Sequence, residues 1–221
     1  RNDWKKLNAE AMRLAKQLME QDNHDGANVK YPLITTASIQ FASRAMPEII
    51  HGNEIVKAKV VGEDLDNAKK ERGKRISEHM SYQLLEEMGE WEEETDKLLH
   101  ALPILGTYFR KTYYDRRLAR NVSTAIPPEE VVVNFKSKSL ETAPRITHTF
   151  SLYLFEVYEL IEAGVWLDQP IQHSGNAEGR DPGEQEDTIP HTFLEQHRRL
   201  DLDHDGYPEP YIVTVHKDTS K

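Results

Sequence analysis

A run of apolar residues at helical spacing extends from Ile76 to Leu102 and constrains the fold more than any other stretch. Successive members lie three or four residues apart, as on one face of an α-helix of about six turns. The opposite face is acidic between residues 86 and 96. The members of this apolar face, here called the seam, are Ile76, Met80, Leu84, Met88, Trp91, Thr95, Leu98 and Leu102. The pattern predicts one long amphipathic helix over 76–101, with Trp91 on its buried side.

The sequence pattern changes directly after this helix. Pro103 cannot continue the hydrogen-bonded ladder of a helix, and Gly106 gives the backbone freedom to turn. Residues 107–114 are mostly aromatic or β-branched, which is typical of a strand. We expect residues 105–115 to share one sheet with 131–135, and the 76–101 helix to pack on that sheet.

The rest of the chain alternates between helical and strand-like patterns without an internal repeat. Residues 1–104 are mostly helical by pattern, and 105–221 are rich in strands and contain a polar loop at 168–188 that we expect to be exposed. Further helices are predicted over 4–21, 33–50 and 152–163, with a turn at 22–28, and further strands over 54–61, 147–150, 192–200 and 210–216. The whole is an α+β chain with long amphipathic helices packed on a mixed, mainly antiparallel sheet.

The composition excludes several classes of protein. The chain has 221 residues, a net charge of -10 and no cysteine. Without cysteine there are no disulfides, thiolate nucleophiles or cysteine-ligated metals, and a reducing intracellular compartment fits this usage. The negative net charge argues against binding of nucleic acid through its phosphates, because such binding requires a surface rich in Lys and Arg. No apolar stretch reaches the length of a membrane span, and no signal peptide is visible.

The most specific short motif is Asp201-x-Asp203-x-Asp205-Gly206, between the last two predicted strands. Calcium loops begin with alternate Asp residues and a glycine that permits a sharp turn. Glu209 stands at the ninth position of such a loop, where it could bind an ion directly or through water. The twelfth position, where a helical calcium hand has a bidentate Glu, is Ile212. Two interpretations therefore stay open: a hard-cation site, and a hairpin turn rich in Asp and Gly.

No catalytic constellation is recognisable in the sequence. His191 and His197 would lie on one face of a strand but about 20 Å apart, too far to share an ion, so we interpret them as ordinary polar residues. The acidic residues at 86–94 occupy the polar face of a regular helix, where solvated charge is the expected role. The predicted protein is not an enzyme and requires no cofactor, with calcium as the one candidate ion.

Five blocks of the sequence, in this order, resemble the portal proteins of tailed bacteriophages. No block is a known site by itself, so the resemblance rests on the number of blocks and on their order, which covers nearly the whole chain. The blocks are HMSYQLLEEM at 79–88, LPILGTYFRKTYYD at 102–115, PEEVVVN at 128–134, SLETAPRITH at 139–148, and LEQHRRLDLDHDGYPEPYIVTVH at 194–216.

The resemblance implies a structural subunit of a ring, typically of twelve copies, at one vertex of a phage or prophage capsid. In that family DNA passes through the ring without specific binding, driven by a terminase motor, and scaffold, capsid and tail adaptor proteins bind around it. The chain begins at Arg1 rather than Met. We therefore expect a fragment that corresponds to the outer α+β wing, with stem, clip and tunnel loop lying mostly beyond Lys221. The implied location is the virion, and the host cytoplasm during assembly.

Two other classes of function remain open at this point. One is a calcium-stabilised protein-binding module, which rests on residues 201–206 alone. The other is a metal-dependent hydrolase that uses the acidic clusters. Ring assembly would favour the portal interpretation, and metal-dependent cleavage of a phosphodiester would favour the hydrolase.

Overall fold

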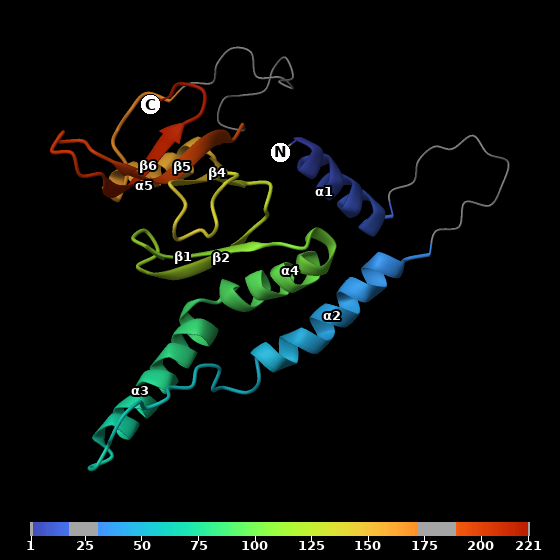
Figure 1. Ribbon diagram of the computed structural model, residues 1–221, viewed down its shortest axis with the longest axis vertical. Coiled ribbons are helices and arrows are strands. Elements are labelled where there is room, and N and C mark those ends of the chain that lie inside the picture. Colours follow the sequence, from blue (N-terminus) through green and yellow to red (C-terminus); the bar gives the residue numbers. More distant parts are fainter. Residues whose placement is uncertain (1, 18–30, 172–188, 221) are drawn as a thin grey trace. The chain divides into compact units, whose positions relative to one another are not determined.

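The computed structural model describes residues 2–17, 31–171 and 189–220. It has the α+β class expected from the sequence, with the elements labelled in Figure 1. The backbone forms two compact units, Arg1–Asp115 with Ala119–Ile126, and Arg116–Leu118 with Pro127–Lys221. The division by composition at residue 104 does not coincide with this boundary, because the first two strands belong to the helical unit. Among the described residues, no helix combines the length and apolar character needed to cross a membrane.

The described residues of the first unit form four α-helices and a two-stranded sheet. The helices α1 (Asn2–Ala15), α2 (Leu33–Ile49) and α4 (Glu90–Leu105) contact one another, and α4 also packs against strand β2 (Arg120–Ile126). Small side chains make the helix contacts: Ser38 and Ala42 of α2 are buried, and the Ser38 hydroxyl donates to the carbonyl of His100. The predicted end of the first helix at 18–21 and the turn at 22–28 lie outside the described residues.

The single helix predicted over 76–101 is wrong. The chain forms α3 (Ala68–Tyr82), a π-helical turn η1 (Gln83–Glu87) and then α4, and the amide of Met88 donates to the carbonyl of Gln83 at 2.9 Å. A π turn inserts one residue and shifts the helical register, so the seam loses its common face. Met88 and Thr95 are buried, whereas Ile76 and Met80 are each 43% exposed. Trp91, expected to be buried, is half-buried.

The end of α4 differs in detail from the expectation. Pro103 lies inside the helix, which continues to Leu105. Gly106 then adopts the left-handed conformation with φ 74°, and its amide donates to the carbonyl of Leu102. This is the αL ending that glycine favours, so Gly106 rather than Pro103 stops the helix.

The predicted strand at 54–61 is also wrong, because its amides bond to a helix. The amides of Val56 and Ala58 donate to the hydroxyls of Ser81 and Ser77 on α3, at 3.1 and 2.7 Å. Gly73 completes this contact: a Cβ there would stand 3.5 Å from the Cβ of Ala58. The segment therefore lies along α3 and does not join a sheet.

The two strands of the first unit form a hairpin. β1 (Phe109–Asp115) pairs antiparallel with β2, from Phe109 opposite Ile126 to Asp115 opposite Arg120. The prediction that this strand shares a sheet with 131–135 is wrong, because the valine strand belongs to the second unit.

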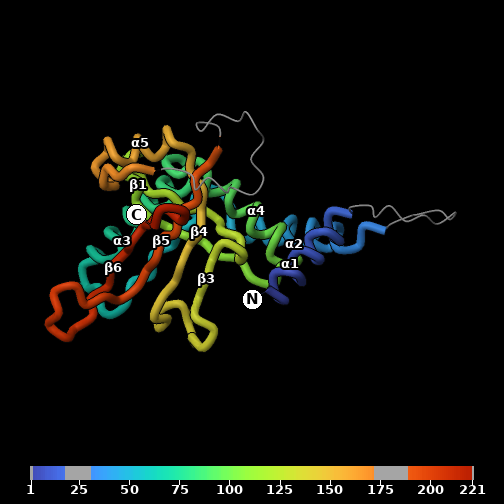
Figure 2. The backbone as a smooth tube through the Cα atoms, turned by 90° about the horizontal axis from the view of Figure 1, so that it is seen from above, coloured from blue at the N-terminus to red at the C-terminus, as the bar shows by residue number. Residues whose placement is uncertain are grey.

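Where the structure describes it, the second unit is a four-stranded antiparallel sheet with one helix. The strand order is β3 (Val131–Val133), β4 (Arg145–Leu152), β5 (His191–Leu200) and β6 (Glu209–His216), as the tube in Figure 2 shows. Helix α5 (Leu154–Glu162) is followed by Gly164 with φ 67°, the glycine expected to stop this helix. The core contains an aromatic cluster in which Phe193 stacks on Phe150, and Trp166 lies 4.9 Å from Phe193 between ring centroids. Most of the predicted loop 168–188, from 172 onward, lies outside the described residues.

Candidate metal centre

The aspartate motif lies at the tip of the β5–β6 hairpin. The two strands pair from Phe193 opposite His216 to Leu200 opposite Glu209, and residues 201–208 connect them. Gly206 has φ 90° and His204 has φ 61°, so the loop uses two positive-φ residues to reverse direction. The two strands predicted on either side of the motif therefore pair as a hairpin, whose connecting loop fixes where the carboxylates lie.

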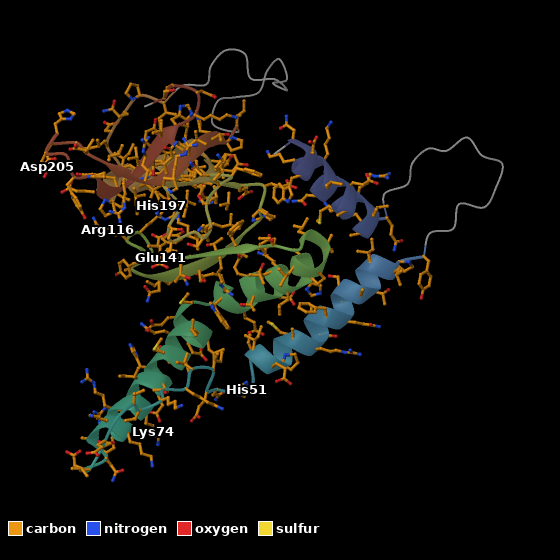
Figure 3. The ribbon with its side chains drawn as sticks, viewed as in Figure 1. His51, Lys74, Arg116, Glu141, His197 and Asp205 are labelled. Atoms are coloured by element: carbon orange, nitrogen blue, oxygen red, sulfur yellow. The ribbon has the colours of Figure 1, made fainter. Side chains whose placement is uncertain are left out.

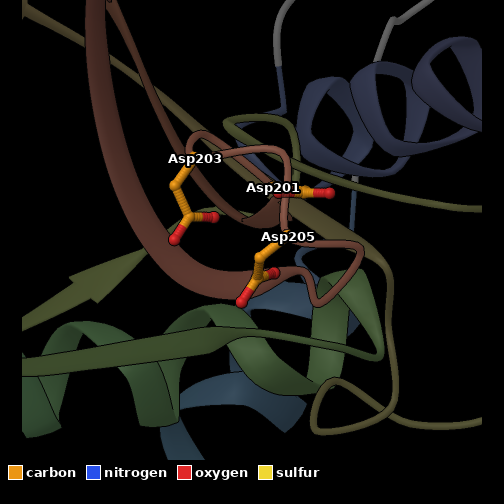
Figure 4. A group of neighbouring side chains, drawn as sticks. All are labelled: Asp201, Asp203 and Asp205. Atoms are coloured by element: carbon orange, nitrogen blue, oxygen red, sulfur yellow. The ribbon is translucent and has the colours of Figure 1, made fainter.

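The loop brings the three predicted aspartates together. One carboxylate oxygen from each of Asp201, Asp203 and Asp205 lies within 4.8 Å of the others. Two oxygens on one Ca²⁺ ion, at 2.3–2.6 Å from it, can be at most about 5 Å apart. Three such oxygens can thus share one cation, with the remaining positions left for water. Figure 4 shows Asp203 and Asp205 with their carboxylates on one side of the loop and Asp201 pointing in another direction.

Hydrogen bonds within the loop hold part of this arrangement. Asp201 Oδ2 accepts from the amide of Gly206 at 3.0 Å, and Asp205 Oδ1 accepts from the amide of Tyr207 at 2.7 Å. Asp201 is half-buried, and its Oδ1 atom is buried without a hydrogen-bond partner in the described part of the chain. Asp203 and Asp205 are exposed. The same loop bonds also serve a plain hairpin turn, so both interpretations remain available.

Glu209, the fourth predicted ligand, is not in this group of three. It is the first residue of β6, and its Oε2 accepts from the Tyr211 hydroxyl at 2.8 Å. This hydrogen bond raises the pKa of the Tyr211 hydroxyl, and burial and the charges of Glu209 and Asp201 add to the shift. Tyr211 was missed in the sequence, although its place two residues after Glu209 on a strand puts both on one face.

The histidine interpretation needs a correction. His191 and His216 are 0% and 2% exposed, and His191 Nδ1 lies 3.2 Å from His216 Nε2. A buried imidazole pair in hydrogen-bond contact is part of the core, so His191 is not an ordinary polar residue. The strand register explains the pair: Phe193 lies opposite His216, and His191, two residues before Phe193 on the same face of β5, lies diagonally across from His216. His197 instead contacts Glu195 Oε1 at 2.8 Å.

The acidic residues at 86–94 have two different roles. Glu90 pairs with Arg120 at 2.6 Å, and Glu94 Oε2 accepts from the amide of Ala125 at 2.6 Å, so both attach α4 to β2. Glu86, Glu87 and Glu92 are exposed. The expectation of uniformly solvated charge therefore holds for only part of the cluster.

No protein-family model matches the chain, and a search of the curated proteins finds no significant match.

Proposed function

We propose that this chain is a structural subunit of a phage or prophage portal ring, which forms the conduit for DNA at a capsid vertex and the attachment point for the tail. The observation that carries the proposal is the ordered set of five portal-like sequence blocks. Together they extend over elements of both units, from the end of α3 at His79 to the end of β6 at His216. A resemblance confined to one unit would support a shared module and not a shared assembly.

The charge and the exposed surface support the same role. A conduit must let DNA pass without retaining it, and a net charge of -10 repels the phosphate backbone. Several large apolar side chains of α1 and α2 remain exposed in the single chain, among them Leu7 at 69%, Leu33 at 66% and Ile39 at 52%. Exposed apolar side chains in such number are typical of a protein that buries them against partners.

The proposed role is structural and needs neither a nucleophile nor a cofactor. The partners are further copies of the chain, a terminase motor, scaffold and capsid proteins, and a tail adaptor. The proposed location is the virion, and the host cytoplasm during assembly.

Native mass spectrometry of the protein expressed from its complete reading frame tests this proposal. We expect one dominant species whose mass is a fixed multiple of the subunit, typically twelve. A monomer at every concentration would contradict the proposal.

Binding of calcium at the β5–β6 tip is a second proposal, favoured by the convergence of Asp201, Asp203 and Asp205 within 4.8 Å. A cation there would relieve the repulsion among three carboxylates and would stiffen the hairpin. This site is compatible with the ring, and as an alternative it could belong to a calcium-stabilised binding module. Measuring the melting temperature with and without calcium distinguishes a calcium site from a hairpin turn that binds no ion.

A further inference from the structure

The α3–η1–α4 segment carries opposite charges at its two ends. Helix α3 has five basic and two acidic side chains, whereas η1 and α4 together have seven acidic side chains and one lysine. We call the exposed cations the basic end and the exposed acids the acidic end. The basic end is Lys69, Lys70, Arg72, Lys74 and Arg75, and the acidic end is Glu86, Glu87, Glu92, Glu93 and Asp96. Figure 3 shows Lys74 projecting from α3.

Several of these charges lack an ion pair within the described chain. Lys74 pairs with Glu78 at 3.7 Å, but no ion pair forms at Lys70, Arg72 or Arg75 among the described residues. At the acidic end, Glu93 pairs with Lys97 at 2.9 Å and Asp96 with His100 at 3.3 Å.

The acidic end also has exposed charges that lack an ion pair among the described residues. Glu86, Glu87 and Glu92 form no ion pair with any described residue, although all three are exposed. Three acids without an ion pair thus face solvent on the same segment as four such cations, since Lys69 Nζ donates to the carbonyl of Glu63 and not to a carboxylate.

The two ends cannot neutralise each other within one chain. Between Arg75, the basic side chain nearest the acidic end, and Glu86 the helical segment rises about 16 Å. This separation is about twice the Debye length of about 8 Å at physiological salt, so intrachain attraction is screened. Surfaces of opposite sign on one molecule are complementary to a second copy placed head to tail.

We propose that the basic end of one copy contacts the acidic end of the next copy, which gives a heterologous, head-to-tail contact. The inference rests on the proposed ring, because such contacts close into rings when the rotation between copies permits it. Apolar side chains between the two ends would be buried in the same contact: Ile76 and Met80 are each 43% exposed, and Tyr82 is 54% exposed. These include the part of the seam that is not covered within the chain.

Charge reversal at each end tests the contact on the 221-residue chain. One variant carries Lys70→Glu, Arg72→Glu and Arg75→Glu, and the other carries Glu86→Lys, Glu87→Lys and Glu92→Lys. Lys and Glu are both good helix formers, so the helices should persist. A matched control reverses three exposed cations of the second unit, Lys136, Lys138 and Arg145.

Sedimentation velocity measures association of these proteins at about 0.01 M and about 1 M salt, where the Debye lengths are about 30 Å and about 3 Å. We expect the wild type and the control to associate at low salt and to dissociate at high salt. Each reversed variant alone should associate at least about tenfold more weakly, because like charges then meet. An equimolar mixture of the two variants should restore association, which also shows that both are folded.

Disulfide trapping detects the same contact when it is transient, because the chain contains no cysteine. Arg72→Cys mixed with Glu87→Cys should give a cross-linked dimer, and the double variant should give a ladder of higher species. Absence of cross-links and of association in every pairing would overturn the inference. Association that is insensitive to both reversals would overturn it as well, but would leave the proposed ring standing. If the reversal of Lys70, Arg72 and Arg75 abolished DNA binding but left self-association unchanged, the inference would be overturned and the basic end would be assigned to nucleic acid.

Discussion

Arg110 of β1 makes three side-chain hydrogen bonds, two to α4 and one to β2. It donates to Ser123 Oγ at 2.6 Å, to Thr95 Oγ1 at 2.7 Å and to the carbonyl of Trp91 at 3.0 Å. Its guanidinium also lies 5.0 Å from the centre of the Trp91 ring. Partial burial lowers the pKa of Arg110, and the charge of Glu94 opposes that shift. This residue is a positioning element of the first unit.

Lysine cannot replace the planar fork of Arg110. We expect Arg110→Lys to lower the free energy of unfolding by about 1–3 kcal/mol, since at least two of the three hydrogen bonds are lost. Urea denaturation measures the loss, with the exposed Arg116→Lys as the control. Equal stability of the two variants would show that the hydrogen-bond network contributes nothing.

Trp91 is half-buried, so its truncation should cost less than the value for a core tryptophan. For Trp91→Ala we expect a loss of about 1–3 kcal/mol, below the 3–5 kcal/mol typical of full burial, because packing against α4 neighbours and the contact with Arg110 are both removed. Urea denaturation of this variant measures the change in the free energy of unfolding. A loss below about 0.5 kcal/mol would place Trp91 on the surface and contradict the register of α4.

The aspartate loop is tested by melting with and without calcium. Extracellular-type calcium loops bind at about 10⁻⁴–10⁻³ M, and we expect this range or weaker binding here; a hundredfold excess, which is about 10–100 mM calcium for that range, raises stability by about 2.7 kcal/mol. We expect millimolar calcium to raise the melting temperature of the wild type and Asp203→Asn to reduce that rise. Asp168→Asn, an exposed aspartate outside the loop, is the control. An unchanged wild-type melting curve would make the loop a hairpin turn only.

At the scale of elements, local sequence patterns predicted where helices and strands occur better than they predicted which elements pack or pair with one another. The β5–β6 hairpin, α2 and α5 follow from alternation, from Pro32 and from Gly164, all of which act over a few residues. The π turn at 83–87 could not be predicted, because the spacing of the seam stays compatible with a regular helix throughout. The pairing of β1 with β2 was missed because 120–126 contains asparagine, serine and threonine among its few apolar residues.

The segment 54–61 also shows that a local pattern does not predict tertiary hydrogen-bond partners. Its alternation predicts a strand, but two of its amides donate to the hydroxyls of Ser77 and Ser81 on α3 and not to a neighbouring strand. In the candidate site, the motif itself identified three clustered aspartates. The hydrogen bond of Glu209 to Tyr211 and the burial of His191 depend on strand register, which the motif does not specify.

The contact between the 54–61 segment and α3 predicts a local change in hydrogen exchange. Ser81 is 1% exposed, so a double variant Ser77→Ala and Ser81→Ala leaves two amides without their acceptors. We expect the amides of Val56 and Ala58 to exchange faster in this variant, with little change in β5 and β6. Unchanged protection at both amides would mean that other contacts hold the segment.

At the scale of the whole molecule, the charge predicts weak interaction with DNA. The net charge is -10, although the basic end of α3 is a cluster of exposed cations. We expect affinity for double-stranded DNA no tighter than the non-specific range of about 10⁻⁴–10⁻⁶ M at physiological salt. A nanomolar dissociation constant in a filter-binding assay would contradict passage of DNA without retention.

Ring assembly is the central claim, and electron microscopy of the protein expressed from its complete reading frame tests it most directly. The account predicts closed rings of uniform diameter with a central opening, and class averages with a single rotational symmetry. Monomers, open filaments or irregular aggregates over the whole range of salt and protein concentration would contradict it.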